Sequence, residues 1–406
     1  MKGLVVVGAS YAGVQAALTA RDAGFAKPIA IVGDEPCLPY QRPPLSKDYL
    51  LDNASEQSLF LRDNAFFGAK GIELILGSRV IDIDLRDRRA ILERGSVLGF
   101  EQLVIAAGSR ARRLEVPGGH LEGVCYLRSL SDAAHLKMRL KQAEDVVIIG
   151  GGFIGLEVAA SATKLGKKVV LIEAGHRLLE RATSPVVSSF LLDAHLRAGV
   201  EIRLLETVAA FEGARGKLST VLLSSGSKVR ADMVVVGIGG IANDELARKA
   251  GLNCTNGVTV SAHGMTDVDG VFACGDCAYH FNRFSKTWTR LESVQNAQDQ
   301  AKAAGLAIAG KHSPDISVPR FWSDQFDLKL QTTGIAGSFD AAVVRGTVDT
   351  GRFSTFYFKD GCLLAVDSIN RPGDQLVARR LIAAGVSPSQ GEAADISFDL
   401  KSLVTP

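Results

Sequence analysis

The chain has 406 residues, enough for two or three domains, and its 47% hydrophobic content indicates a globular protein with large cores. A formal net charge of +2 without any Lys/Arg tract argues against a nucleic-acid-binding protein. No apolar run could span a bilayer, no signal-peptide pattern is visible and the six cysteines are sparse, so we expect a cytoplasmic protein without membrane association.

The first predicted elements are a strand over residues 4–7, a turn with Gly8 and Gly13, and a helix that begins near residue 14. The free N–H groups at the start of such a helix bind anions, most simply a dinucleotide pyrophosphate. Ser10 replaces the second glycine of the usual pattern. A second strand, residues 29–32, precedes Asp34 and Glu35, where an acid can accept hydrogen bonds from a ribose.

Short apolar runs at 72–76, 79–83 and 103–106 predict three more strands, and glycines and a proline between 108 and 119 indicate a linker. The opening pattern then recurs with all three fingerprint glycines, Gly150, Gly152 and Gly155, before a helix over 156–165. The next strand, 168–172, precedes Glu173, which predicts NAD rather than NADP, although two arginines follow nearby.

A third strand-to-turn pattern, 271–273 followed by Gly275 and Asp276, offers an acid to the hydroxyls of a ribityl chain. Two dinucleotide sites in one chain favour an electron relay in which a nicotinamide reduces a flavin. The flavin can then release its electrons singly.

With these residues in view, the whole chain resembles the NADH-dependent, FAD-containing ferredoxin reductases of bacterial haem-thiolate monooxygenase and Rieske dioxygenase systems, which have the glutathione reductase fold. The motifs that carry the resemblance are those at 8–13, 42–47, 150–157, 275–278, 292–294 and 321–325. The resemblance implies an α/β fold with two Rossmann-like domains and a C-terminal α+β domain. It divides the chain into an FAD domain (1–108 and 240–313), an NAD domain (109–239) and a C-terminal domain (314–406).

The resemblance also implies roles for individual residues. Lys47 lies near the flavin N5 and pairs with Glu157, Glu157 holds the nicotinamide carboxamide, and Trp322 packs close to the isoalloxazine; these three are the candidate catalytic residues. The predicted FAD-binding residues are Gly8, Ser10, Tyr11, Ala12, Gly13, Asp34, Glu35, Arg42, Lys47, Val80, Ala106, Gly108, Arg128, Gly275, Asp276, Ser293, Val294 and Trp322. The predicted NAD-binding residues are Gly150, Gly152, Phe153, Ile154, Gly155, Glu157, Glu173, Gly237 and Gly239.

The cysteines bear on rival functions within this fold. Cys274 and Cys277 form the one C-x-x-C pair, but they flank the turn expected to hold FAD, so a redox dithiol is disfavoured, and no ligand set predicts a metal. Cys37 keeps open a cysteine-dependent peroxide reductase or NADH oxidase. A rubredoxin reductase, an enzyme like monodehydroascorbate reductase, and a non-enzymatic NADH-sensing protein like apoptosis-inducing factor also stay open.

The expected partner is a 2Fe-2S ferredoxin, with no nucleic acid. Residues 280–290 interleave Arg283, Lys286 and Arg290 with three aromatic side chains, a pattern that would attract an acidic ferredoxin. A hairpin over 353–369 and a helix over 375–384 are predicted near the C-terminus. That region has no histidine for thiol chemistry, and we expect a monomer or weak dimer.

Overall fold

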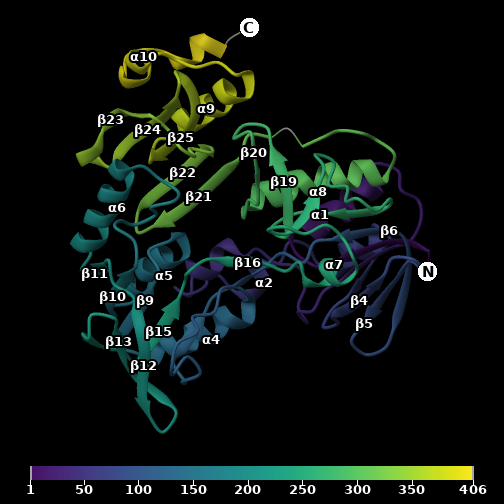
Figure 1. Cartoon of the computed structure of the whole chain (residues 1–406), viewed down its shortest axis with the longest axis horizontal. Helices are drawn as coiled ribbons and strands as arrows, with labels where there is room; N and C mark the ends of the chain where they lie inside the picture. Colours follow the sequence, from purple (N-terminus) through teal and green to yellow (C-terminus); the bar gives the residue numbers. More distant parts are fainter. Residues whose placement is uncertain (1, 316, 405–406) are drawn as a thin grey trace. The chain divides into compact units, whose positions relative to one another are not determined.

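A computed structural model describes residues 2–315 and 317–404. The chain forms two compact units. The first consists of Met1–Gln41, Gln57–Arg110 and Ile241–Phe321, and the second of Arg42–Glu56, Ala111–Gly240 and Trp322–Pro406 (Figure 1). The segment Arg42–Glu56 thus belongs to the same unit as the central part of the chain. The division into three domains stays a prediction.

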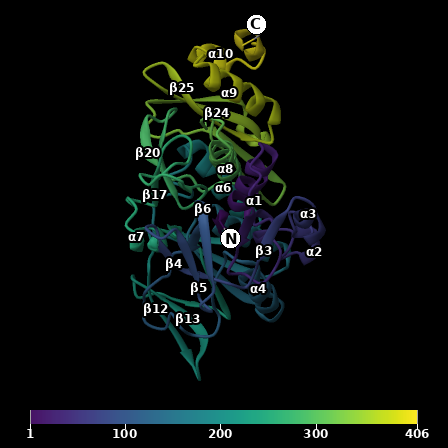
Figure 2. The same cartoon turned by 90° about the vertical axis from the view of Figure 1, so that its right-hand side faces the viewer.

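The first unit is built around a sheet with strand order β3-β2-β1-β6-β5-β4, in which β18 also pairs with β6. The pairs β3-β2, β2-β1, β1-β6 and β6-β18 are parallel, whereas β6-β5 and β5-β4 are antiparallel. Figure 2 shows β4, β5 and β6 side by side. Its elements are β1 (Gly3–Val7), α1 (Tyr11–Asp22), β2 (Ile29–Val32), α2 (Glu56–Leu59), α3 (Asn64–Ala69), β3 (Ile72–Ile75), β4 (Val80–Asp84), β5 (Arg89–Leu92), β6 (Val97–Ile105), β7 (Ser109–Ala111), α7 (Glu245–Lys249), β17 (Val258–Val260), β18 (Val271–Ala273), β19 (Ala278–Asn282), β20 (Thr287–Thr289) and α8 (Val294–Ile308).

Helices α1 and α8 pack side by side against this sheet because both present small residues (Figure 1). A Cβ on Gly305 of α8 would lie 2.7 Å from the carbonyl oxygen of Ala16 in α1. All five residues of β1 and all four of β2 are buried, as expected of parallel strands that are covered on both faces. The two helices therefore pack closely where the end of α8 meets the middle of α1.

The second unit repeats this plan with a parallel sheet of order β11-β10-β9-β15-β8. A second sheet, β12-β13-β14, is antiparallel. The elements are η1 (Pro43–Ser46), β8 (Val124–Tyr126), α4 (Leu130–Gln142), β9 (Asp145–Ile149), α5 (Phe153–Lys164), β10 (Lys168–Glu173), α6 (Pro185–Arg197), β11 (Glu201–Leu204), β12 (Val208–Ala214), β13 (Lys217–Leu223), β14 (Lys228–Arg230) and β15 (Met233–Val236). The short strand β16 (Gly240–Ala242) begins with the last residue of this segment and continues into the first unit.

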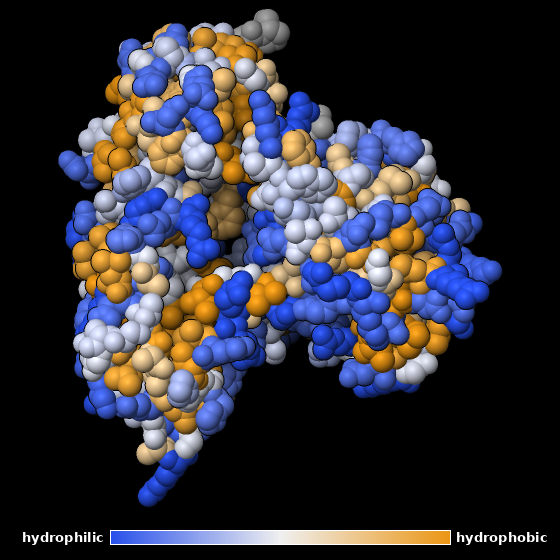
Figure 3. Space-filling view, viewed as in Figure 1, coloured by the Kyte–Doolittle hydropathy of each residue, from blue (hydrophilic) through white to orange (hydrophobic). Residues whose placement is uncertain are grey.

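The C-terminal part of the second unit is a five-stranded sheet of order β21-β22-β25-β24-β23, against which α9 packs (Figure 1). Its elements are β21 (Arg320–Gln325), β22 (Leu328–Gly334), β23 (Ala341–Thr347), η2 (Val348–Thr350), β24 (Arg352–Lys359), β25 (Cys362–Ile369), α9 (Pro372–Ala384), α10 (Gln390–Ala394) and η3 (Leu400–Val404). Its core is continuous with that of the β9 sheet: Phe353 meets Phe190 of α6 edge to face, with ring centroids 5.1 Å apart. With the apolar clusters inside, polar residues are interspersed with apolar ones on the surface (Figure 3).

The elements predicted from the sequence lie within a few residues of those observed. No secondary structure was predicted for the segment 280–290, whose ends form the antiparallel strands β19 and β20. Within residues 2–315 and 317–404, no helix combines the length and apolar character needed to cross a membrane.

Candidate functional site

The predicted FAD-binding residues of the first unit gather where β1, β6 and β18 end. Gly8 follows β1 with a φ of 119°, and a Cβ there would lie 2.1 Å from the carbonyl oxygen of Ala106. A Cβ on Gly13 in the first turn of α1 would lie 1.9 Å from the oxygen of Gly8. Any side chain at these positions would force strand and helix apart. The tight turn therefore presents bare backbone at the start of α1, as a bound pyrophosphate requires.

The two other acidic turns flank this one. Asp34 is exposed after β2, and Glu35 beside it accepts a hydrogen bond from the Tyr40 hydroxyl (2.6 Å). Asp276 follows β18 and accepts a bond from Ser109 Oγ at 3.2 Å, while its backbone oxygen accepts one from Arg290. These carboxylates fit ribose and ribityl hydroxyls as acceptors.

A buried side-chain pair fixes the turn at Gly275. Gln300 of α8 accepts a hydrogen bond from Gly275 N at 2.9 Å, and its amide nitrogen lies 2.8 Å from His280 Nδ1. Burial lowers the pKa of His280, which favours the neutral ring. Ser293 caps α8 by accepting a bond from Asn296 N, so Val294 occupies the first position of the helix. The remaining predicted residues of this unit, Ser10, Tyr11, Ala12, Val80 and Gly108, lie at the start of α1, at the start of β4 and after β6.

The second unit contains the other four predicted FAD-binding residues. Arg42 donates a hydrogen bond to the backbone oxygen of Arg128 at 2.7 Å, and each of the two precedes a helical element. Lys47 ends η1, and half-buried Trp322 lies on β21. These four residues thus belong to a different unit from the other fourteen, and their shared role in binding FAD stays a prediction.

The nucleotide fingerprint of the second unit repeats the geometry of the first. A Cβ on Gly150 would lie 2.4 Å from Gly237 O, and one on Gly155 would lie 2.0 Å from Gly150 O. Gly152 caps α5, whose first residues are Phe153 and Ile154. Gly239 follows β15 with a φ of 103°. The residues fit a dinucleotide in the same way as those of the first unit.

Glu173 has a second role that the sequence did not reveal. Its Oε2 accepts a hydrogen bond from Gly151 N (2.5 Å) and its Oε1 one from Gly175 N (2.6 Å), so the carboxylate also braces the glycine turn. The guanidinium of Arg177 donates to the backbone oxygens of Thr183 and Glu180.

Lys47 and Glu157 come together as expected. Lys47 Nζ lies 3.1 Å from Glu157 Oε1, and their side chains are 14% and 4% exposed. Two hydroxyls that sequence reasoning missed also bind this carboxylate: Ser46 Oγ donates to Oε2 at 2.5 Å, and Ser323 Oγ donates to Oε1 at 2.7 Å. Asp324 Oδ2 lies 3.7 Å from Lys47 Nζ. The signal for both serines was their place in the motifs at 42–47 and 321–325.

The cysteine pair is ill suited to thiol chemistry. Cys274 and Cys277 are fully buried, and burial raises the pKa of Cys277 to about 11 and that of Cys274 well above its usual value. Because the thiolate is the reactive form, both thiols are inert at neutral pH. Cys37 is half-buried. Residues 2–315 and 317–404 contain no cluster of three or more metal-ligating side chains.

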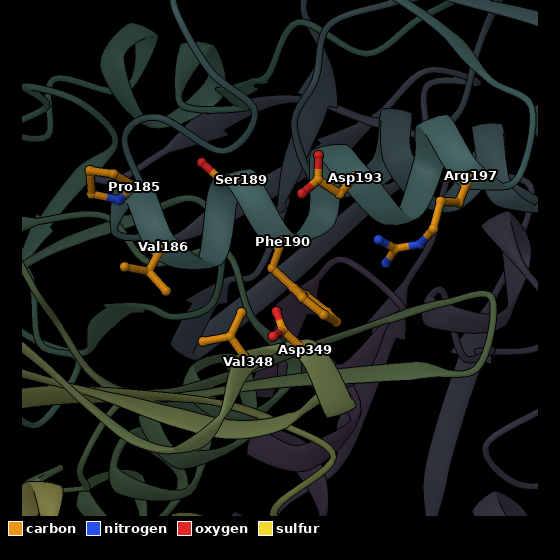
Figure 4. A pocket seen from close by; sticks show the side chains of 8 residues that line it. All are labelled: Pro185, Val186, Ser189, Phe190, Asp193, Arg197, Val348 and Asp349. Atoms are coloured by element: carbon orange, nitrogen blue, oxygen red, sulfur yellow. The ribbon is translucent and has the colours of Figure 1, made fainter.

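A shallow cavity of about 430 Å³ lies beside α6 and contains none of the predicted residues. Figure 4 shows Phe190 projecting from α6 toward Val348 and Asp349, with Asp193 and Arg197 farther along the same helix.

Comparison with known proteins decides the family. The family model described as pyridine nucleotide-disulphide oxidoreductase matches residues 2–301, and the model described as reductase C-terminal matches residues 320–404. The chain belongs to the pyridine nucleotide-disulphide oxidoreductase family. The chain is 42% identical to rhodocoxin reductase of Rhodococcus erythropolis over 401 residues, which cover 99% of this chain and 94% of that protein.

Solved structures agree. The ferredoxin reductase of the CYP199A2 system from Rhodopseudomonas palustris superposes with a TM-score of 0.97 at 38% identity and covers 99% of both chains. The covalent putidaredoxin reductase–putidaredoxin complex gives a TM-score of 0.96 at 38% identity, covering 99% of this chain and 97% of that one. The predicted resemblance to ferredoxin reductases is thereby confirmed, together with the fold class, the ferredoxin–NAD⁺ reductase enzyme class and the cofactors FAD and NAD.

Proposed function

We propose that this enzyme oxidises NADH and passes the electrons singly, through FAD, to a 2Fe-2S ferredoxin that feeds a haem-thiolate monooxygenase or related oxygenase. The buried Lys47–Glu157 pair beside a complete glycine fingerprint carries this proposal. The names of similar proteins, rhodocoxin reductase and a reductase crystallised with putidaredoxin, support the acceptor class.

The first unit holds FAD by the bare turns at Gly8 and Gly275 and by the carboxylates of Asp34 and Asp276. Bound FAD supplies the ability to take two electrons from a nicotinamide and to release them one at a time. The second unit holds the nucleotide at Gly150, Gly152 and Gly155.

Glu157 orients the nicotinamide. Its carboxylate accepts three hydrogen bonds, from Lys47, Ser46 and Ser323, which hold it in one orientation. A carboxylate has about four lone-pair positions, so it can still accept a bond from a carboxamide N–H. Lys47 adds a positive charge in a nearly buried position, where charge interactions are screened less than on the surface.

The preference for NADH rests on Glu173 and Arg177. An acid at the end of β10 accepts hydrogen bonds from the ribose hydroxyls and repels a 2′-phosphate. Arg177 could attract such a phosphate by its charge. However, two of its guanidinium nitrogens already donate hydrogen bonds to the backbone oxygens of Thr183 and Glu180. We therefore infer selectivity for NADH.

The ferredoxin docks on the β19–β20 hairpin of the first unit. Arg283 and Lys286 are exposed at its turn, and Phe281 and Trp288 on its strands are 50% and 48% exposed. Trp288 stacks on Tyr279, which gives the hairpin a rigid aromatic face. Arg290 donates to Asp276 O and pairs with Glu292, so it supports the turn rather than the docking face. The surface combines positive charge for steering with apolar area for contact.

Charge reversal tests this docking face. Replacing Arg283 and Lys286 together by glutamate should raise the KM for an acidic ferredoxin at least tenfold at low salt and leave the KM for NADH unchanged. The matched control is Arg215→Glu with Lys217→Glu, at the β12–β13 turn. Arg215 has a φ of 52°, almost the same as the 53° of Lys286. An unchanged KM for ferredoxin, or an equal rise in the control, would refute the assignment.

Anaerobic mixing tests the relay itself. NADH should bleach the flavin absorbance, and a 2Fe-2S ferredoxin should restore it at a rate that supports turnover. Bleaching without reoxidation by ferredoxin would favour an NADH-sensing protein. A monomeric or weakly dimeric state and a cytoplasmic location stay predictions.

A further inference from the structure

Two buried polar residues of β21 lie behind the Glu157 site: Ser323, which donates to the carboxylate, and Gln325, which has no part in the function described so far. Side chains alternate along a strand, so Ser323 and Gln325 share one face while Trp322 and Asp324 lie on the other. Ser323 is 0% exposed and Gln325 is 1% exposed. Buried polar side chains are costly unless their hydrogen bonds are made, so their partners define what they do.

The partners form a chain that runs through the second unit to Glu157. His195 Nε2 of α6 lies 3.0 Å from Gln325 Oε1, and Gln325 Nε2 donates to Ser323 Oγ at 3.2 Å. Ser323 Oγ in turn donates to Glu157 Oε1 at 2.7 Å. We call these four residues the Glu157 relay.

The direction of each bond in the relay follows from the chemistry of its ends. The Glu157 carboxylate only accepts, so Ser323 must donate to it and accept from the Gln325 amide. The carbonyl of Gln325 then faces His195, whose Nε2 must carry the proton. Every donor therefore points toward Glu157, and such aligned bonds strengthen one another.

The surroundings of His195 support the neutral tautomer with the proton on Nε2. The ring is fully buried and packs edge to face on Phe326 with centroids 4.9 Å apart. Its Nδ1 is buried and, within the described part of the chain, has no hydrogen-bond partner. Protonation of Nδ1 would create a buried, unpaired donor and charge. Burial accordingly lowers the pKa of His195.

From this arrangement we propose that Ser323 and Gln325, anchored by His195, are positioning residues that fix the Glu157 carboxylate for the nicotinamide carboxamide. The proposal rests on the role of Glu157 in the proposed function. It gives Ser323 and Gln325 of the 321–325 motif a role in binding the nicotinamide. Without the relay, Glu157 would keep its bonds to Lys47 and Ser46. It would lose the hydrogen bond that Ser323 of β21 donates to its Oε1.

The test measures NAD⁺ binding to the oxidised holoenzyme by calorimetry, which does not depend on turnover. Ser323→Ala should raise the Kd for NAD⁺ about tenfold, which corresponds to about 1.4 kcal/mol, a usual value for a hydrogen bond to a charged group. Gln325→Met, which leaves the serine in place, should raise it about threefold. Ser188→Ala is the matched control, because Ser188 is an equally buried serine of this unit whose hydroxyl donates to the Leu178 carbonyl at 2.7 Å.

A double-mutant cycle separates positioning from a general structural effect. In a Glu157→Ala background, Ser323→Ala should change the Kd for NAD⁺ less than twofold, because the acceptor of its hydrogen bond is gone. An undiminished effect in that background, or wild-type binding by both Ser323→Ala and Gln325→Met, would overturn the relay while leaving the role of Glu157 intact. Wild-type binding by Glu157→Ala alone would overturn the proposed role of Glu157 as well.

Nitrogen NMR of the histidines gives a second readout on the unmodified protein. His195, identified by its loss in His195→Gln, should be neutral with its proton on Nε2 at pH 7, and Gln325→Met should perturb its signals. A proton on Nδ1, or a charged ring, would reverse the bond to Gln325 and refute the relay even if a variant failed to fold.

Discussion

Replacement by alanine should have different effects at Gly152 and Gly155, the two glycines at the start of α5. A Cβ on Gly155 would lie 2.0 Å from Gly150 O and 3.4 Å from Ile148 Cγ2, whereas one on Gly152 would have only Gly237 O as a neighbour, at 4.0 Å. Gly155→Ala must therefore push α5 away from β9 by about 1 Å or more, because Cβ–oxygen contacts below 3.0 Å essentially do not occur. Gly152→Ala meets no such obstacle in the protein itself.

The magnitudes follow from this geometry. Overpacking against backbone that cannot yield costs on the order of 3 kcal/mol, which lowers Tm by about 6–12 °C for a unit of this size. Gly152→Ala should leave Tm within about 2 °C, but its methyl group occupies the space into which the nucleotide phosphates must come, so the Kd for NAD⁺ should rise at least tenfold.

Scanning calorimetry and NAD⁺ titration of both variants, each purified with FAD, measure these effects. Gly373→Ala in α9 is the control, because no atom lies within 4 Å of its added Cβ. Wild-type stability of Gly155→Ala would refute the packing argument. Wild-type NAD⁺ binding by Gly152→Ala would refute the assignment of this turn to the phosphates.

Three further predictions follow from other parts of the second unit. Glu173→Ala should raise the ratio of kcat/KM for NADPH to that for NADH at least tenfold, and an unchanged ratio would contradict the selectivity argument. Burial raises the pKa of Asp367 to about 6, so the folded state binds its proton more tightly and stability falls as pH rises from about 4 through 6. In chemical unfolding, the free energy of unfolding of Asp367→Asn should rise relative to that of the wild type by at most about 3 kcal/mol between pH 4 and 6. If the difference between the two proteins does not change with pH, Asp367 does not titrate in this range. Arg345 is buried and its guanidinium donates to the carbonyls of Ala393 and Phe398, so Arg345→Met should expose residues 390–404 to limited proteolysis, and wild-type resistance would show that other contacts hold that segment.

The sequence predicted the features that short-range patterns govern. The turns at Gly8 and Gly150 follow from glycine spacing, because a Cβ at either position would lie 2.1 or 2.4 Å from a backbone carbonyl oxygen, and the strands follow from short apolar runs. The pairing of Lys47 with Glu157 came from the family resemblance, since no local pattern links residues 110 positions apart.

Side-chain networks were beyond that reasoning. Ser323 reaches Glu157 across 166 residues, and His195 reaches Gln325 across 130, so their hydrogen bonds depend on how β21 packs against α5 and α6. The second role of Glu173 as a brace for its own glycine turn was missed for a different reason: an acid at that position already had an expected ligand, the ribose. Likewise, Arg290 was considered for its charge near a docking face, and its hydrogen bond to the backbone of Asp276 was missed.

The most direct test of the proposed electron transfer is NADH oxidation by the purified FAD protein, with and without a 2Fe-2S ferredoxin coupled to cytochrome c, in the wild type and in Cys37→Ser. We expect strong stimulation by ferredoxin that persists in Cys37→Ser. Turnover that is indifferent to ferredoxin, requires peroxide and is lost in Cys37→Ser would contradict it and identify a thiol-dependent peroxide reductase.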